Sequence, residues 1–209
     1  MEDYRTIRGT ATGEYEEKKS RFIAQLSFAD SEEKAVAFLE QVRAANRTAR
    51  HNVYAYRLRE GNRERYSDDG EPAKTAGTPA LEVLQHSGLT DLVVVITRYF
   101  GGVLLGTGGL VRAYSSAVKE GIAASKIGTM RYGVRLKICT DYNGIGKIQY
   151  ILRQNGLEAE DTVYTDQVEL TVLLAAECVP GLKKEITEAT AAKAGIEEVE
   201  KLYFVAPDA

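Results

Sequence analysis

Tryptophan is absent from this chain, and cysteine, histidine, methionine and proline are scarce. The 209 residues include 2 Cys, 2 His, 2 Met and 4 Pro. Two cysteines cannot form a disulfide framework, and 19 glycines without a period exclude a collagen-like chain. No apolar run approaches the ~18 residues of a membrane span. The first residues, MEDYRTIRGT, are charged and hold no apolar signal segment, so we expect a cytoplasmic protein without a membrane partner.

The few cysteines and histidines also give little support for a metal centre. Cys139 and Cys178 lie in apolar stretches, which are typical of inert buried thiols in a reducing compartment. His51 and His86 have no Cys or acidic neighbour at the spacing of zinc ligands. The sequence therefore predicts neither a bound metal nor a cofactor.

The composition that is present is that of a folded soluble protein, with 44% hydrophobic and 27% charged residues. The net charge of -3 is unevenly spread. Residues 1–130 hold 18 Lys and Arg against 17 Asp and Glu, a net +1, whereas residues 131–209 hold 9 against 13, a net -4. The acidic second part is a poor candidate for non-specific phosphate binding.

The patterning predicts an α+β protein of two domains, residues 1–130 and 131–209. The second part reads as β-α-β-β-α-β, the order of a ferredoxin-like sandwich. In the first part, strands over 10–17 and 20–28 are followed by a helix over 30–46, which Asp30 would cap.

The rest of the first part contains a hairpin, a short helix, a buried strand and a second long helix. The hairpin covers residues 51–70. Pro79 would open the short helix and Gly88 would end it. The nearly continuous apolar run over 92–100 is typical of a strand buried on both faces, and the second helix would begin at Leu110.

An acidic loop carries the densest chemistry. Asp68, Asp69 and Glu71 lie within four positions, a composition that suits a cation-binding or acid/base loop. The same residues also suit a turn in which Asp side chains accept bonds from nearby backbone amides. His51 could join the carboxylates in space, which is the basis of an enzyme hypothesis.

A glycine-rich segment follows the buried strand. It runs from Thr97 through Gly109 into the second long helix, and a strand, a glycine loop and a helix N-terminus can cradle an anion. It matches neither a Walker loop nor the dinucleotide-binding register, so an RNA phosphate, a peptide or close packing is favoured over a nucleotide. Arg98 should pair with an acidic residue of the loop over 67–77, because a partly buried charge must be compensated. The loop over 67–77 and the loop over 100–109 would then lie side by side.

Arginines gather between residues 43 and 65. Seven of them face only Glu60 and Glu64, a local excess of five positive charges, at Arg43, Arg47, Arg50, Arg57, Arg59, Arg63 and Arg65. Of these, Arg59, Arg63 and Arg65 are the candidates for an RNA-facing surface, because the guanidinium fork suits phosphate and stacks on bases. A solvated hairpin whose charges balance one another is the alternative.

Long motifs in this chain resemble those of the YigZ/IMPACT family. They cover residues 19–24, His51 with 55–57, 67–72, 75–79, 97–102 and 105–114. The resemblance implies that the first domain has the fold of domain 2 of a small-subunit ribosomal protein and of domain IV of elongation factor G. It likewise implies a ferredoxin-like second domain similar to domain V of that factor. Eukaryotic members regulate translation through a ribosome-associated partner.

We therefore expect a cytosolic, non-enzymatic binding module, associated with translation through RNA, the ribosome or a protein partner. The candidate binding residues are His51, Arg57, Asp68, Asp69, Glu71, Arg98, Tyr99, Gly101, Gly102, Gly108, Gly109 and Arg112. The alternative is a hydrolase or metal-dependent enzyme that uses His51, Asp68, Asp69 and Glu71. A third possibility is a protein-binding adaptor, favoured if neighbouring carboxylates neutralise the arginines.

Overall fold

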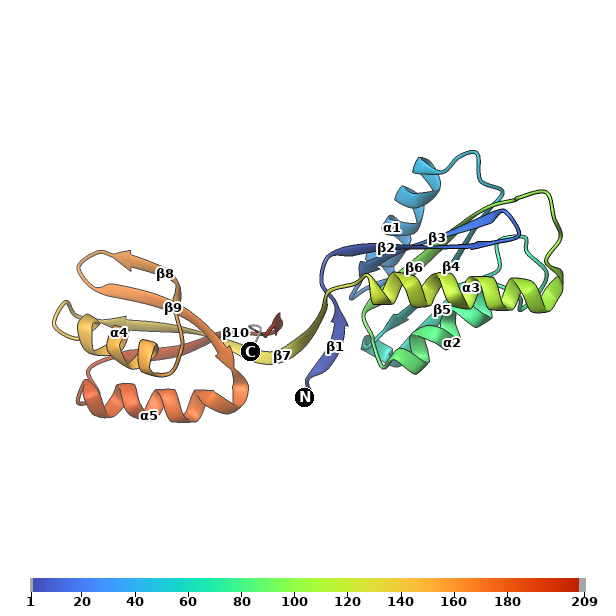
Figure 1. Cartoon of the computed structure of the whole chain (residues 1–209). Coiled ribbons are helices and arrows are strands. Elements are labelled where there is room, and N and C mark those ends of the chain that lie inside the picture. The colour runs from blue at the N-terminus through green and yellow to red at the C-terminus, as the bar shows by residue number, and fades with distance from the viewer. Residues whose placement is uncertain (1, 207–209) are drawn as a thin grey trace. The chain divides into compact units, whose positions relative to one another are not determined.

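The computed structural model describes residues 2–206, which divide into two compact units (Figure 1). The first unit is Tyr4–Thr129, and the second runs from Met130 onward together with Glu2 and Asp3. The Asp3 carboxylate lies 3.4 Å from the Arg131 guanidinium of the same unit. The described residues form two five-stranded antiparallel sheets, so the chain is an α+β protein, as predicted. None of the described helices is long and apolar enough to cross a membrane.

The first unit contains most of the helices and strands. They are β1 (Tyr4–Ile7), β2 (Thr10–Glu17), β3 (Ser20–Phe28), α1 (Glu32–Ala45), β4 (His51–Leu58), β5 (Arg63–Ser67), α2 (Gly77–Ser87), β6 (Leu92–Tyr99) and α3 (Gly106–Ala123). Its sheet has the order β2-β3-β6-β4-β5, so the last strand in sequence lies in the middle. Helix α1 covers one face of this sheet, and α2 and α3 cover the other (Figure 1).

Strand β6 is buried on both faces, which confirms the prediction from its apolar run. Val93 and Val95 pack in the core under α1, while Val94 and Ile96 pack in the core under α2 and α3. Successive side chains of a strand point to opposite faces, so the charged end of β6 follows the same alternation. Arg98 therefore belongs to the α2/α3 face.

Three helices begin at other residues than those predicted. The side chain of Ser31, not Asp30, caps α1 by accepting a 3.3 Å hydrogen bond from the Lys34 amide, and Asp30 pairs with the Lys34 amine instead. Helix α2 begins at Gly77, two residues before Pro79, and ends at Gly88 as predicted. Helix α3 begins at Gly106 and not at Leu110, so the later glycines of the loop form its first turn.

The second unit has the predicted element order. It consists of β7 (Ile127–Thr140), α4 (Ile145–Gln154), β8 (Ala159–Tyr164), β9 (Val168–Ala175), α5 (Val179–Ala189) and β10 (Gly195–Val205). Its strands pair antiparallel in the order β10-β7-β9-β8, and β1 also pairs with β7. Alternate residues of β7 and β9 pack with Ile148 and Ile186 of the two helices in one core.

The other face of the second sheet carries paired charges. Arg135 bonds Glu160 at 2.7 Å and also pairs with Glu200, and Lys137 lies 2.7 Å from Glu169. The prediction of two buried thiols was wrong for Cys178, which is exposed because it lies in the short turn before α5. Cys139 is half-buried.

Candidate functional site

The strand register places two candidate binding residues, His51 and Arg98, in one row across the sheet with Phe22. Phe22 on β3 is paired with Arg98 on β6, and Arg98 is paired with His51 on β4. Paired residues on adjacent strands lie on the same face of a sheet. This row lies at one end of the sheet, on the α2/α3 face. The acidic loop contacts His51 there, and the glycine loop follows the end of β6.

Arg98 pairs with Glu71 of the acidic loop, which confirms the predicted partnership. Its Nη1 donates a 2.6 Å hydrogen bond to Glu71 Oε1, and both side chains are more than nine-tenths buried. The Tyr114 hydroxyl of α3 donates to the same Oε1 at 2.7 Å. Burial and the neighbouring Glu71 carboxylate raise the pKa of Tyr114 well above its ordinary value. The two loops therefore meet around one buried ion pair.

Two aromatic rings enclose the Arg98 guanidinium. Its Cζ lies 5.4 Å from the centre of the Phe22 ring and 5.6 Å from that of the Phe100 ring, within the range of cation–π attraction. Tyr114 packs edge-on against Phe22 with the ring centres 5.0 Å apart. Arg98 Nε is buried and has no hydrogen-bond partner in the described residues. The Nε–H of Arg98 is thus a buried donor that the described protein atoms do not use.

Asp69 fixes the start of β4. Its Oδ2 accepts a 2.6 Å bond from the Asn52 amide, and its Oδ1 accepts a 3.1 Å bond from Arg43. The Asp69 carbonyl lies 2.8 Å from His51 Nδ1. A carbonyl oxygen can only accept, so His51 Nδ1 carries the proton and Nε2 is the nitrogen left for another partner.

The Asp68 side chain caps the start of α2. Its carboxylate accepts three backbone amides, those of Lys74, Ala76 and Gly77, at 2.9, 3.0 and 2.8 Å. The negative charge at these amides suits the positive end of the helix dipole. All three carboxylates of the acidic loop thus have partners within the protein. Within residues 2–206, no group of three His, Cys, Asp or Glu side chains is arranged to hold a metal ion.

The glycine loop is shaped by two conformational needs. A Cβ on Gly101 would lie 2.1 Å from the backbone carbon of Lys19, and the Gly101 amide donates a 3.1 Å bond to Ser20 Oγ. Gly102 has φ of 87°, a left-handed conformation that favours glycine. Gly108 and Gly109 lie in the first turn of α3, and Arg112 is exposed on the same helix.

An open groove of about 500 Å³ lies beside this arrangement. It is lined by Thr48, Ala49, Arg50, His51, Arg98, Tyr99, Phe100 and Leu104. Phe100 is 52% exposed and Leu104 is 83% exposed. Arg50 is exposed and has no ion-pair partner in the part of the chain that the structure describes. The lining contains no carboxylate, so the groove combines apolar contact area with positive charge.

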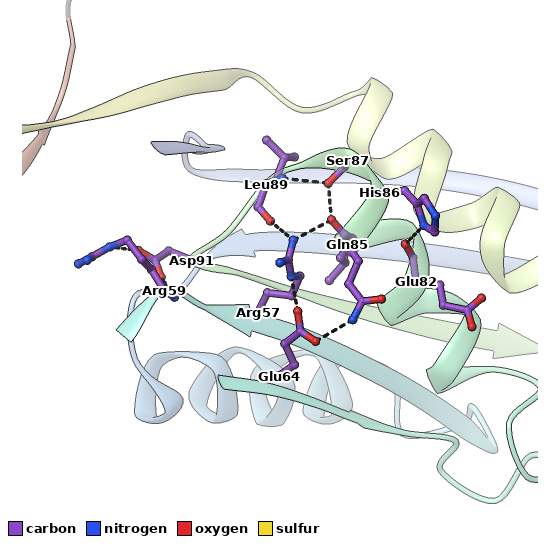
Figure 2. A network of polar contacts seen from close by, with 10 residues as sticks. Arg57, Arg59, Glu64, Glu82, Gln85, His86, Ser87, Leu89 and Asp91 are labelled. Carbon is purple, nitrogen blue, oxygen red and sulfur yellow. Dashed lines mark hydrogen bonds and ion pairs between the residues drawn. The ribbon is translucent and has the colours of Figure 1, made fainter. Parts of the chain in front are cut away.

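Of the predicted binding residues, Arg57 lies away from the groove and Tyr99 lies at its edge. Arg57 lies toward the other end of β4, where it bonds Glu64 at 2.7 Å and the Leu89 carbonyl at 2.9 Å (Figure 2). These contacts link β4 to its neighbour β5 and to the segment that follows α2. Tyr99 shares an edge of the groove, but its hydroxyl donates to Asn46 at the end of α1.

The arginines of the β4–β5 hairpin have acidic partners distant in the sequence. Arg63 and Arg65 lie 3.6 and 3.4 Å from the Glu32 carboxylate, and Arg59 lies 3.8 Å from Asp91. The count of charges between residues 43 and 65 leaves these two carboxylates out. Their presence reduces the local excess of positive charge at the hairpin.

Four residues of the site were missed as candidates, although the sequence motifs include most of them. Phe100, Leu104 and Arg50 line the groove, and Tyr114 holds Glu71. Because side chains alternate between the faces of a strand, Arg98 lies on the same face as Ile96, but the apolar run of β6 does not show in the sequence which face that is. No signal in the sequence pairs β3 and β4 with β6, and that pairing creates the row across the sheet.

Comparison with known proteins matches residues 18–122, which contain the acidic loop, the glycine loop and the groove, to the Impact N-terminal domain. The chain belongs to the IMPACT family. Residues 139–193 match a domain of unknown function, DUF1949.

Relatives of this IMPACT family member include bacterial proteins of similar length. The chain is 34% identical to the IMPACT family member YvyE of Bacillus subtilis (strain 168) over 205 residues, which cover 98% of this chain and 94% of the relative. It is 44% identical to YigZ of Escherichia coli (strain K12) over 125 residues, 58% of this chain and 61% of the relative. A solved structure described as that of an hypothetical protein aligns with a TM-score of 0.64 and 33% identity, covering 96% of this chain and 98% of that one.

Proposed function

We propose that this IMPACT family member is a non-enzymatic binding module associated with translation, and that it binds RNA in the groove beside Arg98. The observation that carries the proposal is the lining of the groove. Arg50 supplies an exposed positive charge, Phe100 and Leu104 supply exposed apolar surface, and the residues that line the groove include no carboxylate. The charge of Arg98 is paired with Glu71 behind the lining. Positive charge interleaved with exposed aromatic rings is the composition of surfaces that hold nucleic acid.

The balance of charge in the first unit supports the same proposal. Residues 4–129 hold 18 Lys and Arg against 15 Asp and Glu, a net +3, although the whole chain carries -3. Long-range attraction of a polyanion depends on this distribution more than on the total. The carboxylates of the acidic loop are bonded to Arg98, Arg43 and backbone amides, so the proposal assigns them to structure.

We further propose the domain folds that the family resemblance implies. The second unit would be a ferredoxin-like domain, because its β-α-β-β-α-β order and its strand order β10-β7-β9-β8 agree with that topology. The first unit would have the fold of domain 2 of a small-subunit ribosomal protein, and the boundary of the two domains would lie near residue 130. A module with this pair of folds suits a ribosomal partner.

A protein partner is the second candidate, and two observations favour it. Val103 and Leu104 are exposed large apolar residues beside the groove, at 45% and 83%. The hairpin arginines Arg63 and Arg65 share the carboxylate of Glu32, which weakens the attraction of that surface for phosphates. An adaptor that contacts protein and not RNA would use the apolar loop. It would bind ribosomes through their proteins, without contact to ribosomal RNA.

The test measures RNA binding by the full chain. Fluorescence anisotropy of a labelled single-stranded RNA is followed over a range of salt concentrations for the wild type and for Arg50→Gln. Removing one arginine–phosphate interaction should lower the slope of log affinity against log salt by about 0.7 to 0.9. Arg153→Gln is the matched control, because Arg153 is an exposed arginine of α4 without an ion-pair partner in the described residues.

Cosedimentation with purified ribosomes tests the link to translation. The proposal expects the wild type to sediment with ribosomes, and Arg50→Gln to do so less than Arg153→Gln. Absence of RNA binding at low salt, with sedimentation that survives ribonuclease, would favour the protein partner. Absence of both would overturn the proposed function.

A further inference from the structure

Phe100 presents a half-exposed aromatic ring on a rigid support. The ring stands directly after β6, and the Arg98 guanidinium lies 5.6 Å from its centre. That guanidinium is itself held by Glu71 and by the ring of Phe22. Contact with a fixed cation polarises the ring and restrains its orientation, while 52% of the residue stays exposed.

The backbone after Phe100 keeps the ring outside the core. Gly101 packs against the backbone of Lys19 and donates to Ser20 Oγ, so the chain is attached to the β2–β3 turn at that point. Gly102 then reverses the chain with φ of 87°. The exposure of Phe100 therefore follows from fixed backbone contacts on its C-terminal side and from the buried strand on its N-terminal side.

The exposed ring shares the groove with a cation that suits a phosphate and with a hydrogen-bond acceptor. Arg50 is exposed without an ion-pair partner in the described residues, and it is the cation that suits a phosphate. Because His51 Nδ1 donates to the Asp69 carbonyl, its Nε2 is left as a hydrogen-bond acceptor. The groove holds about 500 Å³, within the ~300–1,000 Å³ of small-ligand sites. Leu104, which is 83% exposed, adds apolar surface at the rim.

We propose that the groove takes one unpaired nucleotide of RNA, with its base stacked on Phe100 and its phosphate held by Arg50. This inference rests on the proposed function and names the form of RNA that it concerns. Bases in a duplex have both faces covered by neighbouring pairs, so only an unpaired base can offer a face to an aromatic side chain. Stacking is tolerant of sequence, because every base has such a face.

The test compares single-stranded and double-stranded RNA. Phe100→Leu keeps an apolar side chain of similar reach and removes the aromatic face, while Phe100→Tyr retains that face. We expect Phe100→Leu to weaken binding of a short oligoadenylate by roughly 5- to 100-fold. Phe100→Tyr should bind it as the wild type does. Binding of a blunt-ended duplex should change little, and the salt slope should be unchanged because no charge is removed.

The matched control is Tyr150→Leu, which removes a 63% exposed ring from α4 in the second unit. A 2-aminopurine placed in the oligonucleotide reports stacking directly, and its quenching should be lost in Phe100→Leu alone. Equal binding by Phe100→Leu and the wild type, or an equal loss for single strand and duplex, would overturn this inference while the proposed function stands. If the wild type binds no RNA of either form, both fall together. Thermal melting of each variant establishes that the groove is still folded.

Discussion

The Arg98 guanidinium donates a 2.6 Å hydrogen bond to the carboxylate of Glu71, 27 residues earlier in the chain. Both side chains are almost fully buried, and Tyr114 completes the set from α3. The contact joins the central strand, the loop before α2 and the long helix α3. It also fixes the guanidinium against Phe100 at the groove.

Glu71→Gln tests the energetic weight of this pair. Removing one member of a buried ion pair leaves the other charge uncompensated, so we expect a loss of about 3–5 kcal/mol in the free energy of unfolding. Urea denaturation followed by circular dichroism measures it. Glu14→Gln is the control, because the Glu14–Arg21 pair is exposed and should contribute little. A small loss in Glu71→Gln would mean that Arg98 turns into the solvent of the groove.

Tyr114→Phe should give a difference in stability that depends on pH. The hydroxyl donates to a charged acceptor, so its loss should reduce the free energy of unfolding by about 1.5–3 kcal/mol at pH 8. Burial and Glu71 raise the pKa of Tyr114 above its ordinary value of 10.0. The wild type therefore keeps this stability below pH 10 and loses it as the pH rises further, because the unfolded chain releases the proton first. A difference between the two proteins that stays constant from pH 8 to above pH 10 would contradict the assignment.

Gly101 and Gly102 should respond differently to substitution. Gly101→Ala places a Cβ 2.1 Å from the Lys19 backbone, so the two segments must separate there. A Cβ at residue 102 has no neighbour within 4 Å, but Gly102→Val strains a left-handed backbone, and we expect a loss of about 1–3 kcal/mol. Gly146→Ala in α4 is the control, since nothing lies near its Cβ position and its φ is ordinary. Thermal melts of the three variants measure these losses against the Gly146→Ala control. An unchanged melting temperature in Gly102→Val would assign that glycine to flexibility or to a ligand.

The hairpin arginines provide a separate prediction about RNA. If Arg59, Arg63 and Arg65 face RNA, replacing all three by Gln should weaken binding by a similar factor for any sequence. The salt slope should fall by about 0.7–0.9 for each phosphate that an arginine no longer neutralises. Titration of ribosomal RNA at two salt concentrations measures both quantities. An unchanged affinity and slope would remove the hairpin from the RNA surface and would leave the groove as the proposed site.

The local sequence determined most of the elements. The charged turn between β2 and β3, the apolar run of β6 and the glycine after α2 predicted their elements closely, because each depends on residues a few positions apart. Errors occurred at helix starts. Asp68 caps the start of α2 from beyond the helix, and the glycines that seemed to form a loop begin α3.

The motifs in the sequence also determined which segments would carry the site, and the need to compensate a buried charge predicted that Arg98 would pair with the acidic loop. Only the tertiary structure decided which carboxylate it would be and what the others do. Glu71 reaches Arg98, whereas Asp68 and Asp69 turn to backbone amides. Side-chain direction in an irregular loop depends on the strands packed beside it, and no local pattern encodes that packing. The groove has the same origin, because Arg50 and Phe100 meet only through the pairing of β4 with β6.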